Sequence, residues 1–156
     1  MKRTLFIGLM LAASMTLFAR TIPAGYVDLG LPSGTLWKAA NEPGLYMYGA
    51  AKNSFDGHMP SFQQFRELFD NCSCKWMEDG CRVTGPNGNT IFFSYDGYID
   101  CDEEMQQQGE YVQIWLNSEE NSTASHMYFT KAYKQHNSSY SYKCTRNSVH
   151  LVISGR

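Results

Sequence analysis

Apolar and polar residues alternate in the stretch 26–41, which reads Y-V-D-L-G-L-P-S-G-T-L-W-K-A-A-N. Val27, Leu29 and Leu31 are separated by single polar or small residues, the period expected of a strand with one buried face. The break 32–34 then supplies a proline and a glycine, which favour a chain reversal. The pattern predicts a strand, a turn and a second strand.

A helical pattern begins at Ser61. Ser61 and Gln64 have the spacing of a capping box, in which each side chain bonds the other residue's backbone N–H. Apolar residues follow at helical spacing on one face: Phe62, Phe65, Leu68, Phe69 and Cys72. We therefore predict one main helix over about 61–72, and a loop over 42–59, where no period is sustained.

Period-two patterns separated by Gly, Pro and Asn breaks return after this helix. They predict strands at 75–77, 81–84, 90–95, 111–116, 126–133, 140–144 and 149–153. The stretches 117–125 and 134–139 are expected to be loops. One helix followed by many short strands predicts a single α+β domain over 20–156, with the helix packed on antiparallel sheets.

The first nineteen residues differ from the rest. Lys2 and Arg3 precede a run of apolar or small residues over 5–19, which is short for a membrane span. This pattern predicts a signal peptide over 1–19, cleaved after Ala19, and a protein that is secreted, periplasmic or at the cell surface. An uncleaved anchor is the alternative, and we expect no membrane span once the signal peptide is removed.

The charge and composition of the chain argue against some classes of function. The 156 residues carry a formal net charge of −2, and the pI is about 6.0. A nucleic-acid-binding protein normally has a basic face, so nucleic acid is not an expected partner. Aromatic residues make up 14% of the chain, which favours a folded domain over a disordered one.

The five cysteines all lie beyond the predicted signal peptide, where disulfides form readily. We expect two disulfides, Cys74 with Cys81 across a hairpin and Cys101 with Cys144. The odd number leaves at least one thiol unpaired or bonded to another molecule.

Four segments together resemble one known family: 26–37 (Y-V-D-L-G-L-P-S-G-T-L-W), 59–68 (M-P-S-F-Q-Q-F-R-E-L), 71–76 (N-C-S-C-K-W) and 83–93 (V-T-G-P-N-G-N-T-I-F-F). They are similar to the Fibrobacter succinogenes major paralogous domain, common in secreted proteins of gut Bacteroidetes. The resemblance implies a C-type lectin-like fold, a fold that formylglycine-generating enzymes share.

In that fold the first and last strands pair, so the resemblance implies that 26–29 lies beside 149–153. The position of a usual family cysteine is Ala40 here, which implies that Cys72 is the unpaired thiol. The central insert and the C-terminal signature of the family are also shortened or altered in this chain. The resemblance is therefore to a divergent, shortened member of the family.

Residues with metal or catalytic chemistry form no familiar motif. Asp100, Asp102, Glu103 and Glu104 place four carboxylates in five positions, but without the alternation and central glycine of a known calcium loop. The Cys-Ser-Cys of 72–74 matches neither a redox motif nor a zinc half-site. The four histidines share no metal spacing, and no nucleophile elbow or phosphate loop occurs. We therefore expect no enzyme activity, metal or cofactor.

Tyrosines alternate with small polar residues near the C-terminus, and we interpret Tyr133, Tyr140 and Tyr142 as binding residues. Tyrosine gives a large contact area at low entropic cost, and serine adds adaptable hydrogen bonds. The alternative is that these tyrosines only cover a sheet. The sequence thus favours a secreted, non-enzymatic binding module for protein or glycan. A structural subunit of a surface assembly, or an unrecognised hydrolase on the same fold, is the alternative.

Overall fold

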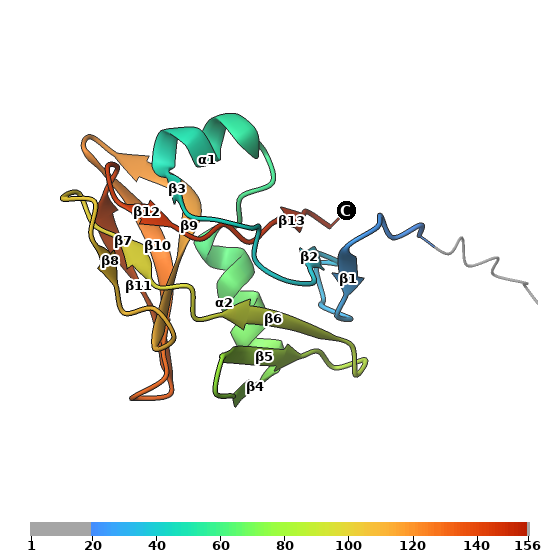
Figure 1. Ribbon diagram of the computed structural model, residues 1–156. Helices are drawn as coiled ribbons and strands as arrows, with labels where there is room; N and C mark the ends of the chain where they lie inside the picture. The colour runs from blue at the N-terminus through green and yellow to red at the C-terminus, as the bar shows by residue number, and fades with distance from the viewer. Residues whose placement is uncertain (1–19, 156) are drawn as a thin grey trace, which may run out of the picture.

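The computed structural model describes residues 20–155, so the predicted signal peptide lies outside the described part (Figure 1). The described chain is mostly β, with 43% of residues in strands and 12% in two short helices. Its strands form four small antiparallel sheets. The predicted α+β, C-type lectin-like fold with one main helix is therefore wrong.

The helices are α1 (Tyr48–Ser54) and α2 (Phe62–Asn71). The strands are β1 (Tyr26–Asp28), β2 (Leu36–Lys38), β3 (Tyr46–Met47), β4 (Ser73–Trp76), β5 (Gly80–Thr84), β6 (Thr90–Ser94), β7 (Tyr98–Ile99), β8 (Met105–Gln106), β9 (Tyr111–Glu120), β10 (Thr123–Thr130), β11 (Gln135–Tyr142), β12 (Arg146–Asn147) and β13 (Val152–Ile153).

The two ends of the described chain share a sheet but do not pair with each other. Its order is β1-β2-β13, so Trp37 of β2 lies between Val27 and Val152. The predicted pairing of 26–29 with 149–153 is therefore wrong. The reason is the turn at 31–34, closed by Gly34 N–H donating to the Leu31 carbonyl at 2.9 Å. It folds β2 directly onto β1 and leaves the far edge of β2 free for β13.

The middle of the chain forms the sheet β4-β5-β6, as the alternating pattern predicts. Both hairpins are in uninterrupted register, with Cys74 opposite Val83 and Arg82 opposite Phe92. Gly88 has φ +88°, the left-handed conformation that favours glycine in a turn. Local turn chemistry thus accounts for this sheet.

A third sheet, β11-β10-β9, contains the longest strands. Much of the two predicted loops, 117–125 and 134–139, is strand here. The sheet continues through them because the turns are tight: Asn121, with φ +46°, begins the reversal between β9 and β10. Lys134, with φ +50°, ends the reversal between β10 and β11.

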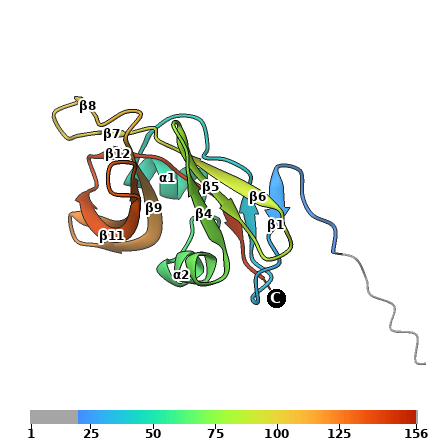
Figure 2. The same ribbon diagram turned by 90° about the horizontal axis from the view of Figure 1, so that it is seen from below.

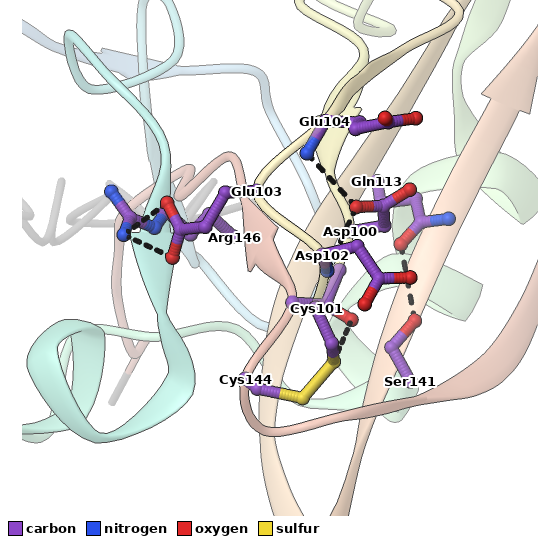
Figure 3. Close-up of a disulfide and its surroundings, with 10 residues drawn as sticks. Asp100, Cys101, Asp102, Glu103, Glu104, Gln113, Ser141, Cys144 and Arg146 are labelled. Atoms are coloured by element: carbon purple, nitrogen blue, oxygen red, sulfur yellow. Dashed lines mark hydrogen bonds and ion pairs between the residues drawn. A yellow bond between two sulfur atoms is a disulfide. The ribbon is translucent and has the colours of Figure 1, made fainter.

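The fourth sheet, β3-β12-β7-β8, joins short strands from distant parts of the chain. A disulfide between Cys101 and Cys144 ties the β7–β8 loop to the segment before β12 (Figure 3). This is the second of the two expected pairs. It closes a loop of 43 residues, which restricts the unfolded chain.

Helix α2 confirms the helix predicted from the capping box. Ser61 is the N-cap: its hydroxyl accepts from the Gln64 backbone N–H at 3.2 Å, and the Gln64 side chain accepts from the Ser61 N–H at 2.8 Å. Phe65 and Leu68 are buried, but Phe62, predicted on the buried face, is 44% exposed. Helix α1 was not predicted.

Two aromatic clusters form the core. The larger cluster packs Trp37, Phe65, Phe93 and Phe129 between α2 and the sheets, while the smaller one surrounds Trp115 and α1. In Figures 1 and 2, α2 lies between the sheet β9–β11 and the sheet β4–β6. No helix among residues 20–155 is long and apolar enough to cross a membrane.

Candidate functional site

The three tyrosines predicted to bind a ligand lie at two separate places. Tyr133 is 75% exposed in the turn before β11, whereas Tyr140 and Tyr142 are 63% and 64% exposed near the end of that strand. The five steps along the strand from Gln135 to Tyr140 span about 17 Å at about 3.4 Å per residue. The structure therefore brings Tyr140 and Tyr142 together and leaves Tyr133 apart.

Strand β11 is the edge of its sheet, so one side of its backbone has no neighbouring strand in the described chain. Lys143 N–H donates to the Ser122 carbonyl at 3.0 Å, which makes this a hydrogen-bonded pair. Such pairs alternate with non-bonded ones along an antiparallel ladder. By this alternation, the backbone groups of His136, Ser138 and Tyr140 point away from β10.

One of these outward groups already has a local partner. Ser138 N–H donates to the side-chain oxygen of Asn137 at 2.8 Å. A side chain that bonds an edge N–H in this way occupies a donor that no strand uses. The contact agrees with an outward direction for the Ser138 backbone.

The usual protections of an edge strand are missing from β11. Natural edges are commonly blocked by charged residues, proline or bulges. The strand reads Q-H-N-S-S-Y-S-Y, without Lys, Arg, Asp, Glu or Pro, and its eight-residue register with β10 is unbroken. The irregularity in this sheet lies on the other side, between β10 and β9.

Two cavities accompany β11 on the side of α2, and the exposed ring of Phe62 borders both. One, of about 220 Å³, lies toward Phe69 and His136; the other, of about 300 Å³, lies toward Tyr140. Ser138 also lines both. We call this surface the β11 groove; its residues are Phe62, Arg66, Phe69, Asp70, Leu116, Ser118, Ser125, Met127, His136, Asn137, Ser138, Ser139 and Tyr140.

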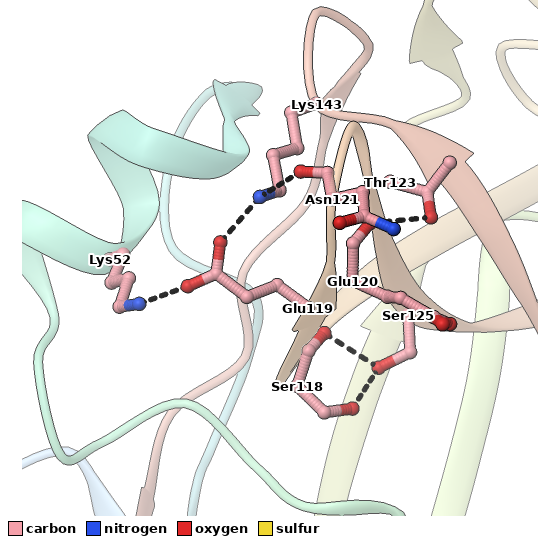
Figure 4. Close-up of polar contacts among 8 residues, drawn as sticks. All are labelled: Lys52, Ser118, Glu119, Glu120, Asn121, Thr123, Ser125 and Lys143. Carbon is pink, nitrogen blue, oxygen red and sulfur yellow. Dashed lines mark hydrogen bonds and ion pairs between the residues drawn. The ribbon is translucent and has the colours of Figure 1, made fainter.

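The groove has aromatic and polar walls. The rings of Phe69 and His136 stack with centroids 3.6 Å apart, and burial lowers the pKa of His136. At the other end, the hydroxyls of Ser118 and Ser125 are hydrogen-bonded to each other (Figure 4). The groove can therefore accept apolar contacts and hydrogen bonds.

The opposite face of the sheet holds β11 in place. The hydroxyl of Ser141 donates to the side-chain oxygen of Gln113 at 3.1 Å and lies 3.2 Å from Nδ1 of His126. His126 is buried, and burial lowers its pKa to about 4. These contacts fix the strand on the side away from the groove.

Ion pairs hold the β9–β10 hairpin against α1 (Figure 4). The carboxylate of Glu119 contacts both Lys52 of α1 and Lys143, the latter at 2.6 Å. Lys143 also donates to the Asn121 carbonyl at 2.6 Å. Since β10 pairs with β11, these contacts link α1 to the sheet that contains β11.

Two of the acidic residues at 100–104, Asp100 and Glu103, have partners in their own loop or in β12 (Figure 3). The Asp100 carboxylate accepts from the backbone N–H groups of Asp102 and Glu104, and these bonds lower its pKa. Glu103 pairs with Arg146 through two contacts of 2.8 Å. Within residues 20–155, no cluster of three or more His, Cys, Asp and Glu could hold a metal ion.

The expected disulfide between Cys74 and Cys81 is absent, and both are free thiols, as is Cys72. The register puts Cys81 opposite Trp76, so Cys74 and Cys81 are diagonal neighbours. Diagonal positions are about 7–8 Å apart in sheets, at the limit of what a disulfide spans. A hydrogen bond between the thiols lowers the pKa of Cys74 and raises that of Cys81, while burial raises the pKa of Cys72 to about 11.

Sequence reasoning missed most of the groove. Phe62 was assigned to the core, and Ser118, Ser125 and Ser138 lay in stretches predicted as loops. The Ser-Tyr alternation near Tyr140 was the available signal. No family model, curated protein or solved structure matches the chain, so the resemblance to the Fibrobacter succinogenes major paralogous domain stays a prediction.

Proposed function

We propose that this protein is a secreted, non-enzymatic binding module whose ligand is an extended polypeptide segment. The segment adds to the free edge of β11 as a further strand, and its side chains enter the β11 groove. Secretion is supported by the pattern of residues 1–19 and by the disulfide between Cys101 and Cys144.

The observation that carries the proposal is the uncovered edge of β11. Backbone N–H and C=O groups at His136 and Tyr140, and the C=O of Ser138, match the groups that another strand presents, and an added strand takes over the Ser138 N–H from the Asn137 side chain. Strand addition of this kind takes its affinity from main-chain hydrogen bonds. A glycan has no backbone N–H and C=O groups at the regular spacing of a β-strand, so it cannot form the ladder of hydrogen bonds that this edge offers.

The groove supports selectivity among peptides. Side chains of an added strand alternate between the two faces, so every second one points toward α2, about 7 Å from the next. The two cavities lie along β11 on that side, with Phe62 between them. Phe69 and His136 favour an apolar or aromatic side chain in the first cavity, and the serines favour a polar one in the second.

The test is a selection of random peptides displayed on phage against the protein, followed by titration of the selected peptides. Ser138→Pro removes one outward N–H, which in the free protein donates to the Asn137 side chain, without touching the bonds to β10. We expect it to weaken peptide binding at least about tenfold, the effect of one lost hydrogen bond plus a clash. Ser138→Ala keeps the N–H and adds no bulk to the groove, so it should bind much more tightly than Ser138→Pro.

Other results would contradict the proposal. Peptides that bind wild type and Ser138→Pro equally would show that the edge is not used. Binding of glycans that depends on Tyr140 but not on the Ser138 N–H would favour a glycan module. A dimer that dissociates only in Ser138→Pro would favour a structural subunit that pairs through its own edges.

A further inference from the structure

A third cavity, of about 450 Å³, lies away from the β11 groove. It is bounded by the segment 41–45 after β2, by the end of β6, and by the strands β7 and β8. Its volume falls within the range of small-ligand sites, about 300–1,000 Å³. None of its lining residues contributes to the groove.

The carboxylate of Asp96 lines this cavity in a fixed orientation. Its Oδ2 accepts hydrogen bonds from Nδ2 of Asn41 at 2.8 Å and from the hydroxyl of Ser148 at 2.9 Å. Ser148 is fully buried. Within residues 20–155, Oδ1 of Asp96 has no hydrogen bond or ion pair, so one carboxylate oxygen is available to a ligand.

Buried groups behind the cavity hold Asn41. Nδ1 of His150 lies 2.9 Å from Oδ1 of Asn41, and Nε2 of His150 lies 2.7 Å from the Lys38 carbonyl. His150 is fully buried, and burial lowers its pKa to about 3. A neutral imidazole has a single N–H, so it donates to only one of these two oxygens. The amide nitrogen of Asn41 is held on the side of Asp96 by Ser94, whose hydroxyl oxygen and carbonyl accept from it at 3.1 and 3.3 Å.

The charge on the cavity lining is negative. Glu42 and Asp96 both line it, and no Lys, Arg or His does. The Glu42 carboxylate is paired with Lys38 at 2.6 Å, whereas Asp96 has no cationic partner in the described chain. A partly enclosed carboxylate held by two donors interacts more strongly with a cation than one in bulk water.

Part of the remaining wall is apolar. Leu45, Ile99 and Met105 line the cavity, and Met105 is 47% exposed. Methionine is flexible and adapts to the shape of a bound group. An alkyl chain can lie along this wall while a charged head reaches Asp96.

We propose that this cavity binds an organic cation, an ammonium or guanidinium group on a short alkyl chain. Asp96 pairs with the charged group, and Leu45, Ile99 and Met105 cover the chain. A free alkylamine and a lysine or arginine side chain share this chemistry. The inference does not depend on peptide binding to β11, since the two surfaces have no residue in common.

The experiment titrates the protein with pentylammonium, its neutral counterpart pentanol, and Nα-acetyl-lysine N-methylamide. Binding is followed by NMR at the δ1 methyl group of Ile99. We expect saturable shifts with pentylammonium and at least about tenfold weaker binding of pentanol, the effect of one charge-assisted contact. Equal binding of the lysine derivative identifies a side-chain ligand, and binding of pentylammonium alone identifies a free amine.

Asp96→Asn removes the charge and keeps an oxygen for Asn41 and Ser148, so it should remove the preference for pentylammonium. Asp56→Asn, the same change at an exposed position outside the lining, should bind as wild type. Methyl signals of buried Met59 and Met127 report whether each variant is folded. Met105→Lys, at an exposed wall position, should weaken pentylammonium binding without affecting the core.

The proposal is overturned if pentanol binds as well as pentylammonium, or if no saturable shift occurs at Ile99. It is equally overturned if folded Asp96→Asn, or Met105→Lys, retains the full preference for the cation.

Discussion

His126 is a buried titratable side chain beneath the proposed peptide-binding strand. Its ring packs near Trp115, and Nδ1 faces the hydroxyl of Ser141 in β11. Burial disfavours the charged imidazolium and lowers the pKa to about 4. The histidine therefore links the stability of the sheet to pH.

The sign of this linkage follows from the lowered pKa. The unfolded chain takes up the proton near pH 6.5, whereas the folded protein resists it down to about pH 4. The stabilisation that neutral, buried His126 gives the folded protein is fully present above pH 6.5. Between pH 6.5 and about pH 4 the free energy of unfolding falls by about 1.4 kcal/mol for each pH unit. We predict that urea unfolding at pH 7, 6 and 5 shows falling stability.

His150 and His136 also have lowered pKa values: His150 is fully buried, and His136, although exposed at the surface, loses water from the ring face that stacks on Phe69. The variant His126→Gln separates their effect from that of His126, since it removes one titrating ring and keeps a polar side chain. Its unfolding free energy should depend less steeply on pH than that of the wild type. The same slope in both proteins would show that His126 does not titrate as described.

At the scale of elements, the α2 cap is a short-range feature that the sequence alone predicts. We expect Ser61→Ala to destabilise the protein by about 1 kcal/mol, because the Gln64 N–H loses its acceptor. Chemical denaturation measures the change. Gln63→Ala, on the exposed face of the same helix, is the matched control and should change stability little. A cost for Ser61→Ala no larger than for the control would contradict the assigned cap.

Other elements could not be predicted, because tertiary contacts form them. Helix α1 buries only Tyr48 and Ala51, too few positions to show a helical period. Strand β11 lacks the alternation of apolar and polar residues, since His136, Asn137 and Ser138 are all polar. It is a strand because the turn after β10 places it beside a strand already in position.

The same reasons explain the limits of the site prediction. Tyr140 and Tyr142 were found because exposed aromatics among serines are typical of recognition surfaces. Phe62 was placed in the core because its helical spacing matches that of Phe65. In the structure the Phe62 ring borders the two cavities beside β11 and is 44% exposed, so spacing along the helix did not determine its burial.

At the scale of the whole molecule, strands could be predicted but their partners could not. The pairing of β2 with β13, and of β3 with β12, joins segments about a hundred residues apart in the chain. Local patterns carry no information about such partners. The fold class was therefore wrong even where the individual strands were right.

Four small sheets leave several edges, and the proposed peptide site uses one of them. Strand β11 is long, uncharged and in unbroken register, and cavities lie along it. The ion pairs around Glu119 and the contacts of Ser141 keep it in place. With these features, β11 offers an open edge, already held in position, to which another strand can add.

Amide hydrogen exchange resolved by residue, with and without a selected peptide, tests this claim most directly. In the free protein, the amides of Asn137 and Ser139 should be protected by β10, while those of His136 and Tyr140 should exchange quickly. Bound peptide should slow exchange at His136 and Tyr140 at least about tenfold, since each outward N–H gains a partner. Protection of these two amides in the free protein, or unchanged exchange at saturating peptide, would contradict the account.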